Sequence, residues 1–197
     1  ADKAEVTSIR TYNDIYNLKK LSVDAKNAVV IGGGVIGLEA ASELARYGIN
    51  VVVLEVLPVL MPRLLDDETA NTLQRSIKSF EIHTNVKVEE ITGNGKVEEV
   101  KLADGRSFPA EFVVISTGVR ANTKIAIDAG IKCEKAVVIN EYAETSAKDI
   151  YACGDCCQYK GANYALWSQA TEQGIAAGTN ITGGNVSMGI IDSTMVL

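Results

Sequence analysis

The chain has 197 residues, of which 47% are hydrophobic and 22% are charged, and its formal net charge is −6. This length and composition are typical of a globular protein with one well-buried core, or with one domain and part of another. No basic cluster that would form a nucleic-acid groove stands out, and the longest apolar runs are of strand length, so neither nucleic acid nor a membrane is expected as a partner.

The N-terminal part of the chain predicts helices and strands in alternation. A helix over residues 11–20 leads into an apolar strand at 28–31. A second helix, from about 35 to 47, is followed by a second strand at 51–54. Such alternation favours an α/β fold with a Rossmann-like parallel sheet.

A glycine-rich turn separates the first strand from the second helix. It reads Gly32-Gly33-Gly34-Val35-Ile36-Gly37, which is the pattern G-x-G-x-x-G. The first glycine permits a tight turn, the second lets a pyrophosphate approach the backbone, and the third lets the helix pack close to the sheet. The free N–H groups of the helix start attract a phosphate. These six residues predict a dinucleotide site; the alternative is a tight turn without a ligand.

An acidic residue, Glu55, ends the second strand. It lies 18 positions after Gly37, about the spacing at which an acid meets the adenosine ribose. A carboxylate accepts hydrogen bonds from both ribose hydroxyls and repels a 2′-phosphate, so we expect NAD rather than NADP. A solvated strand end is the alternative interpretation of Glu55.

The middle of the chain predicts a helix and then an antiparallel meander. The acids at 66–68 favour the start of a helix that runs to about Phe80. Strand-like runs then follow at 86–91, 96–102 and 107–110, and the turns between them contain Asn94-Gly95 and Asp104-Gly105, which are strong hairpin signals. The chain is expected to return to the main sheet at 112–116. The single histidine, His83, is expected at the surface rather than in a catalytic site.

The C-terminal part predicts a partial second α/β layer. Strands are expected at 136–139 and at 149–153, the latter ending at Gly154-Asp155. A helix is expected over 165–180. Only one dinucleotide unit is complete, and the later strands fit a second layer whose other half is not in the sequence.

Four cysteines occur in the sequence, at Cys133, Cys153, Cys156 and Cys157. The N-terminal residues do not have the pattern of a secretory signal, so reduced thiols in the cytoplasm are expected. The C-x-x-C spacing of Cys153 and Cys156 leaves a redox dithiol open as an alternative. No metal site is predicted, because the single histidine is distant from the cysteines in the sequence.

Together these segments resemble the pyridine nucleotide–disulfide oxidoreductase superfamily of NADH-dependent flavoproteins. The branch that contains NADH oxidases, rubredoxin reductases and the flavoprotein part of assimilatory nitrite reductases is the most similar. The resemblance covers nearly the whole chain. It rests on four stretches, at residues 30–39, 116–122, 145–155 and 165–174.

The resemblance implies a reaction and a role for each site residue. The reaction is hydride transfer from NADH to FAD, with electrons passed on to an unidentified small molecule or small redox protein. Gly118 would bring backbone close to NAD, and Glu39 would lie near the nicotinamide. Asp155 would bind the FAD ribityl chain, and Ala165, Leu166 and Trp167 would begin a helix facing the flavin. The alternatives are a surface acid at Glu39, a turn acid at Asp155 and a packing role for Trp167.

The resemblance also implies a division of the chain. Residues 1–12 would cross over from the first half of an FAD domain, 13–122 would form the NAD-binding domain, 123–185 would complete the FAD domain, and 186–197 would begin a C-terminal domain. No second glycine motif precedes Gly32, so we expect the isolated chain to be inactive. The resemblance implies that the parent protein is an enzyme and a homo-oligomer. The alternatives are a non-catalytic nucleotide-binding fragment and a disulfide reductase that uses the dithiol.

Overall fold

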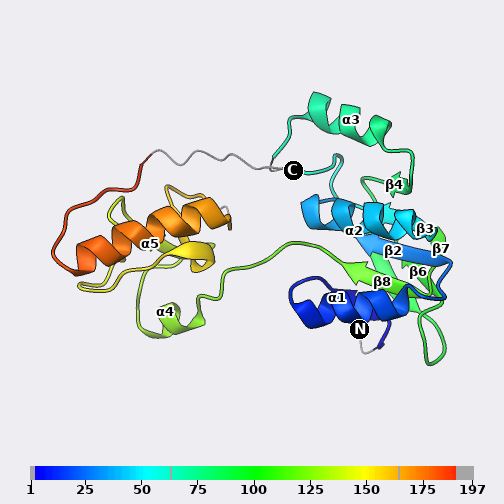
Figure 1. Cartoon of the computed structure of the whole chain (residues 1–197), viewed down its shortest axis with the longest axis horizontal. Coiled ribbons are helices and arrows are strands. Elements are labelled where there is room, and N and C mark those ends of the chain that lie inside the picture. The colour runs from blue at the N-terminus through cyan, green and yellow to red at the C-terminus, as the bar shows by residue number, and fades with distance from the viewer. Residues whose placement is uncertain (1–2, 63, 164, 190–197) are drawn as a thin grey trace. The chain divides into compact units, whose positions relative to one another are not determined.

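The computed structural model describes residues 3–62, 64–163 and 165–189, and it divides into two compact units. The first unit is Ala1–Gly118 and the second is Val119–Leu197, and their elements are labelled in Figure 1. The predicted start of a further domain at 186–197 lies outside the described residues from position 190 onward. Residues 186–189 adopt neither a helix nor a strand.

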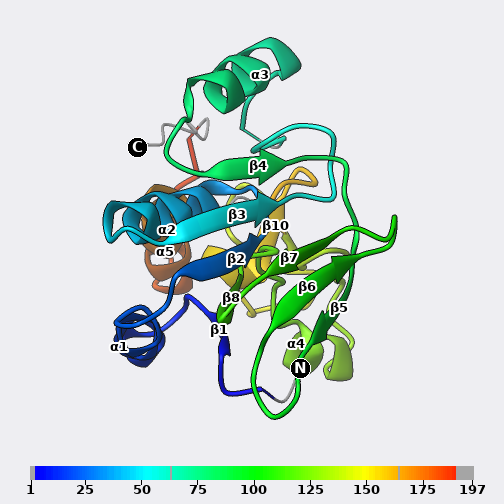
Figure 2. The same cartoon turned by 90° about the vertical axis from the view of Figure 1, so that its right-hand side faces the viewer.

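A parallel five-stranded sheet is the centre of the first unit. The sequence predicted a parallel sheet but not its strand at residues 6–8. Its strand order is β1-β8-β2-β3-β4. Ile31 lies opposite both Leu54 and Ile115, so the carboxyl ends of three neighbouring strands meet at one edge of the sheet. Figure 2 shows β2, β3 and β4 side by side. The strands are β1 (Val6–Ser8), β2 (Asn27–Ile31), β3 (Asn50–Leu54), β4 (Glu81–His83) and β8 (Phe112–Ile115).

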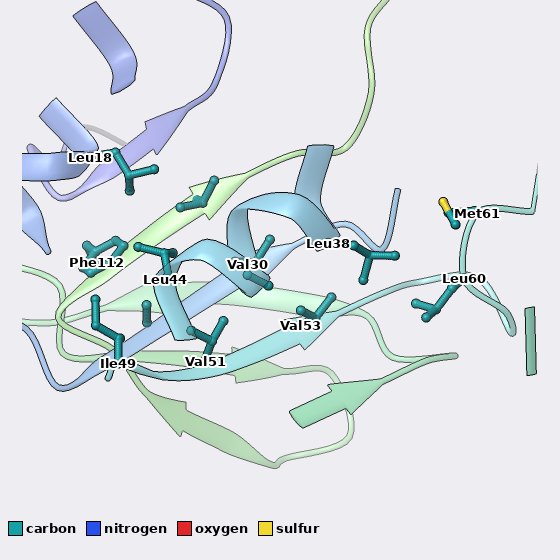
Figure 3. Packing of buried hydrophobic residues seen from close by; sticks show 13 residues of the cluster. Leu18, Val30, Leu38, Leu44, Ile49, Val51, Val53, Leu60, Met61 and Phe112 are labelled. Atoms are coloured by element: carbon teal, nitrogen blue, oxygen red, sulfur yellow. The ribbon is translucent and has the colours of Figure 1, made fainter. Parts of the chain in front are cut away.

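Two helices, α1 (Tyr12–Leu21) and α2 (Val35–Arg46), cover one face of this sheet. Alternate residues of the strands point toward them, because successive side chains of a strand face opposite sides. Figure 3 shows the resulting core between the sheet and α2. The buried side chains there include Leu18, Val30, Leu38, Leu44, Val51, Val53 and Phe112.

The opposite face of the sheet is covered by a three-stranded antiparallel meander, which confirms the sequence prediction. The strands are β5 (Val88–Thr92), β6 (Glu99–Leu102) and β7 (Ser107–Pro109). They bury Val100 and Leu102 against Val29 and Val113, the sheet residues that point away from the helices.

The helix between β3 and β4 is shorter than predicted. α3 (Asp67–Ser76) begins after the N-cap Asp66, whose side chain accepts a hydrogen bond from the backbone N–H of Thr69. It ends at Ser76 and not near Phe80, because Ile77 adopts extended backbone angles (φ −73°, ψ 119°) that break the helical hydrogen-bond pattern.

The second unit is built around a pair of parallel strands and one long helix. β9 (Val137–Ile139) pairs with β10 (Cys157–Tyr159), and α5 (Trp167–Ile181) packs against both through Ala176 and Ala177. Two shorter elements complete the unit: helix α4 (Lys124–Asp128) and the 3₁₀ turn η1 (Gly154–Cys156).

Two sequence predictions for this unit were wrong in detail. Residues 149–153 do not form a strand, since Tyr151 makes only an isolated bridge to Glu144 and Asp149 has a left-handed φ of 61°. The long helix starts at Trp167 and not at Ala165, whose φ of 52° is incompatible with a right-handed helix. β10 was not predicted from the sequence.

None of the helices in the described ranges has the length and apolar character needed to cross a membrane.

Candidate functional site

The glycine-rich turn lies at the carboxyl edge of the first unit's sheet, between β2 and α2. The backbone N–H of Gly32 donates a hydrogen bond to the carbonyl of Leu54, with 2.8 Å between N and O. Gly32 has a φ of 114°, and a Cβ at this position would clash with the carbonyl oxygen of Ser116. The turn off β2 therefore requires glycine at this position.

The other two glycines of the motif differ in their surroundings. A Cβ on Gly37 would clash with the carbonyl oxygen of Gly32, so the third glycine allows α2 to pack close to the turn. A Cβ on Gly34 would meet no atom of the described residues within 4 Å. The middle glycine thus faces open space, and a ligand's phosphate can approach its backbone, as the sequence predicted for a dinucleotide.

The N-terminus of α2 is not capped by a side chain within the described residues. Its N-cap is Gly34, and its first turn contains no acidic residue. By contrast, α1 and α3 are capped by the side chains of Thr11 and Asp66. The first N–H groups of a helix lack partners within it and carry a positive partial charge. The start of α2, with Val35 and Ile36 in its first turn, fits a pyrophosphate.

Glu55 is buried, with 8% of its surface exposed, and it contacts the glycine-rich turn directly. Its Oε2 accepts a hydrogen bond from the Gly33 N–H at 2.6 Å, and its Oε1 accepts one from the Leu57 N–H at 2.8 Å. A carboxylate has about four acceptor sites on its two oxygens, so acceptor sites remain for ribose hydroxyls. Glu55 is therefore not a solvated strand end.

Two further predicted residues lie in the same unit. Glu39 is exposed in the second turn of α2, and Gly118 is exposed after β8 with a left-handed φ of 92°. Among the described residues, the Glu39 side chain has no hydrogen-bond partner.

His83 joins the parallel sheet to the meander. Its Nε2 lies 2.7 Å from Glu81 Oε1, its Nδ1 lies 3.4 Å from Arg106 Nη1, and its ring packs on Phe108. Its backbone carbonyl accepts a hydrogen bond from the N–H of Glu55 at 2.8 Å. These contacts indicate a structural role at the sheet edge.

In the second unit, the turn η1 presents the predicted flavin residue Asp155. Its side chain is exposed. The turn is held by Gln173, whose Oε1 accepts from the Gly154 N–H at 2.7 Å, and by Asn163, whose Nδ2 donates to the Asp155 carbonyl at 2.9 Å. The sequence reasoning assigned no role to Gln173 or Asn163, since only the tertiary structure brings them to this turn.

The start of α5 is the second helix end that fits an anionic group. In the part of the chain that the structure describes, no side chain caps it, and its N-cap is Leu166. Ala165 precedes it in a left-handed conformation, which costs a non-glycine residue about 1–3 kcal/mol. Trp167 is 88% exposed, so it does not pack within its own unit. The first N–H groups of α5 therefore lack side-chain partners among the described residues and carry a positive partial charge.

The cysteines beside this turn differ in accessibility. Cys153 is exposed, and the Cys156 Sγ donates to the Cys153 carbonyl at 3.3 Å. Cys157 is buried, and burial, reinforced by the neighbouring thiols, raises its pKa to about 12. Cys157 is therefore an unreactive packing residue at neutral pH. The described ranges contain no group of three or more His, Cys, Asp or Glu residues placed to hold a metal ion.

Comparison with known proteins gives one consistent result. Residues 1–174 match the family described as pyridine nucleotide-disulphide oxidoreductase. The chain is 36% identical over 175 residues to a nitrite reductase [NAD(P)H] of Bacillus subtilis (strain 168), and the match covers 88% of this chain and 22% of the relative. It is 34% identical over 154 residues to a rubredoxin-NAD(+) reductase of Ectopseudomonas oleovorans, covering 77% of this chain and 40% of the relative.

A solved structure agrees with these relatives. An FAD-dependent pyridine nucleotide-disulphide oxidoreductase from Desulfovibrio vulgaris is similar with a TM-score of 0.79 and 30% identity, covering 94% of this chain and 50% of that chain. The chain thus spans half or less of each of these relatives.

Proposed function

The chain belongs to the pyridine nucleotide-disulphide oxidoreductase family, and from this premise we propose that it is the NADH-binding part of a flavoprotein that passes a hydride from NADH to FAD. The cofactors of this family, NAD(H) and FAD, carry the redox chemistry, and the protein positions them and tunes their charge. The chain's own residues would bind these cofactors, orient them and stabilise their charges.

One observation carries the proposal. Gly34, the glycine with open space beside it, is also the N-cap of α2. The backbone of the glycine-rich turn and the first N–H groups of the helix therefore face the same space. This arrangement supports pyrophosphate binding by Gly32, Gly33, Gly34, Val35, Ile36 and Gly37. The buried carboxylate of Glu55 supports NADH over NADPH, because a second negative charge beside it would be repelled.

Further residues have proposed roles on the same basis. Glu39 would position the nicotinamide, and Gly118 would bring backbone close to NAD. In the second unit, Asp155 would bind the ribityl chain of FAD. The start of α5, at Ala165, Leu166 and Trp167, would stabilise the negative charge of the reduced flavin.

The acceptor of the electrons is proposed to be a small molecule or a small redox protein. The name of the rubredoxin-NAD(+) reductase supports the second option by similarity. We also propose that the parent protein is a homo-oligomer in the cytoplasm, where thiols such as the exposed Cys153 stay reduced.

The proposed division of the chain is that residues 13–122 bind NAD and that residues 123–185 complete an FAD domain. It is supported by the uncapped start of α2 in the first compact unit and the uncapped start of the longer helix α5 in the second.

A calorimetric titration of the chain with NADH tests the proposal. We expect saturable binding of one NADH per chain. The variant Glu43→Gln is a control for folding and charge that should bind NADH like the wild type, because Glu43 lies on α2 and pairs with Arg46 at the surface. If the wild-type chain binds no NADH under conditions in which it is folded, the proposed function is wrong.

A further inference from the structure

Helix α5 carries two buried glutamines one turn apart. Gln169 is 4% exposed and Gln173 is 5% exposed. Residues four positions apart lie on the same face of a helix, so both side chains face the same side of α5. Both line a narrow pocket with Gly154 of the η1 turn and with Ala165 and Leu166 before the helix.

Hydrogen bonds within the second unit explain the burial of the Gln173 side chain. Its Oε1 accepts hydrogen bonds from the Gly154 N–H at 2.7 Å and from the Cys157 Sγ at 3.2 Å. Gln173 therefore fixes the turn that presents Asp155.

The burial of the Gln169 side chain, by contrast, is not explained by its hydrogen bonds. Its Nε2 is buried and has no hydrogen-bond partner among the residues that the structure describes. A buried amide donor left without an acceptor destabilises the fold. Gln169 is the third residue of α5, and side chains of a helix lean toward its N-terminus. An unpartnered donor therefore lies at the uncapped helix end.

We propose that the Gln169 side chain donates a hydrogen bond to the pyrimidine edge of the flavin, and that it acts as a positioning residue that raises the flavin's reduction potential. This inference rests on the proposed function. Reduction places negative charge on the N1–O2 edge of the ring, and an N–H donor beside that edge stabilises the reduced form more than the oxidised form.

The proposal requires a small movement of the side chain. Nε2 is enclosed by its neighbours, so Gln169 has to rotate toward the helix N-terminus to reach the ring. Leu166 and Ala165 precede the helix there, and the strained φ of Ala165 keeps this segment out of the helix. The flavin edge would then meet the side-chain amide and the backbone N–H groups of the first turn.

The test uses the flavoprotein to which we propose this chain belongs, loaded with FAD, and measures its midpoint potential. Gln169→Leu and Gln169→Met each remove the donor in a neutral side chain of similar size. We expect both variants to bind reduced FAD about tenfold more weakly relative to oxidised FAD, which lowers a two-electron potential by about 30 mV. The visible absorption band of the oxidised flavin should shift as well.

The control is Ile175→Ala, which changes an exposed residue in the third turn of the same helix and should leave both readouts unchanged. If Gln169→Leu does not fold, Gln169→Met still decides the question. Potentials and spectra equal to those of the wild type in the folded variants would show that Gln169 only packs. Variants that bind oxidised and reduced FAD more weakly by the same factor, and so keep the wild-type potential, would also overturn the proposal.

The wild-type protein separates this inference from the proposed function. A wild type that takes up FAD and is bleached by NADH supports the proposed function whatever the variants do. A wild type that takes up no FAD overturns the proposed function, and with it the role of Gln169.

Discussion

The carboxylate of Glu55 accepts a hydrogen bond from the backbone N–H of Gly33, with 2.6 Å between Oε2 and N. This contact joins the acid at the end of β3 to the glycine-rich turn at the end of β2. Glu55 thus fixes the glycine-rich turn, and in the function that we propose it also places a negative charge beside the adenosine ribose. The two roles can be separated by mutation.

We expect the wild-type chain to bind NADH more tightly than NADPH and Glu55→Gln to narrow that difference, because the glutamine removes the charge while keeping one acceptor oxygen. Glu55→Ala should also lower the free energy of unfolding by about 1–3 kcal/mol, since the N–H groups of Gly33 and Leu57 lose their acceptor. Calorimetric titration with NADH and with NADPH measures the change in nucleotide preference, and thermal unfolding measures the loss of stability. Equal affinity of the wild type for NADH and NADPH would contradict the assignment.

Substitutions in the glycine-rich turn should separate binding from folding. Gly34 has extended backbone angles (φ −81°, ψ 178°) and open space around it, so Gly34→Val should fold normally. It should nevertheless weaken NADH binding at least about tenfold, because the side chain occupies the place of the pyrophosphate.

Gly37→Ala is the matched comparison. Its methyl group would clash with the carbonyl of Gly32, so we expect a loss of about 1–3 kcal/mol of folding stability. Normal NADH binding by Gly34→Val would mean that the turn has only a structural role.

The isolated chain should neither retain FAD tightly nor oxidise NADH at enzymatic rates. FAD needs a second phosphate-binding turn and helix end, and this sequence has one G-x-G-x-x-G motif, which NAD would occupy. Trp167 is the only tryptophan and is 88% exposed, so its fluorescence reports directly on the start of α5. Excess FAD should leave this emission largely unquenched. Stoichiometric flavin retention with NADH turnover would show that the chain completes the site in another way, for instance by oligomerisation.

The three clustered cysteines should react at very different rates. Alkylation at pH 8 should label the exposed Cys153 first and leave Cys157 unmodified, because burial raises the pKa of Cys157 to about 12. Mass spectrometry of peptides from the folded chain measures the order. Early labelling of Cys157 would contradict the packing around it.

The raised pKa of Cys157 also predicts a pH dependence of stability. Its pKa lies near 9.0 when unfolded and near 12 when folded, so between these values the folded state holds a proton that the unfolded state has lost. The protonated Cys157 therefore makes its full contribution to the free energy of unfolding below pH 9. Above pH 9 this contribution declines by about 1.4 kcal/mol per pH unit. Denaturant unfolding of wild type and Cys157→Ala between pH 8 and 10 isolates this contribution, as a steeper decline in the wild type.

A count of free thiols before and after NADH addition tests the dithiol alternative. We expect no change, since hydride transfer to flavin uses neither Cys153 nor Cys156. Thiols that appear on addition of NADH to the oxidised protein would favour the disulfide reductase.

The sequence alone determined the local features of this protein. The strand, glycine turn and helix around Gly34 are set by residue types next to one another in the chain, and so are the Asn-Gly and Asp-Gly turns of the meander. The acid at position 55 could be recognised by its spacing. Where the local pattern was weaker, prediction failed: residues 149–153 have strand-like composition, but the left-handed backbone of Asp149 and a single bridge leave them irregular.

The tertiary structure decided what depends on partners distant in sequence. Only the parallel register of β2, β3 and β8 brings Gly32, Glu55 and Ser116 to one edge, and only there does Glu55 fix the Gly33 N–H. The two glutamines of α5 are the same residue type one turn apart, yet Gln173 holds the η1 turn while the Nε2 of Gln169 has no partner among the described residues. Whether a buried polar atom has a hydrogen-bond partner depends on residues that only folding brings next to it, so the sequence alone could not predict it.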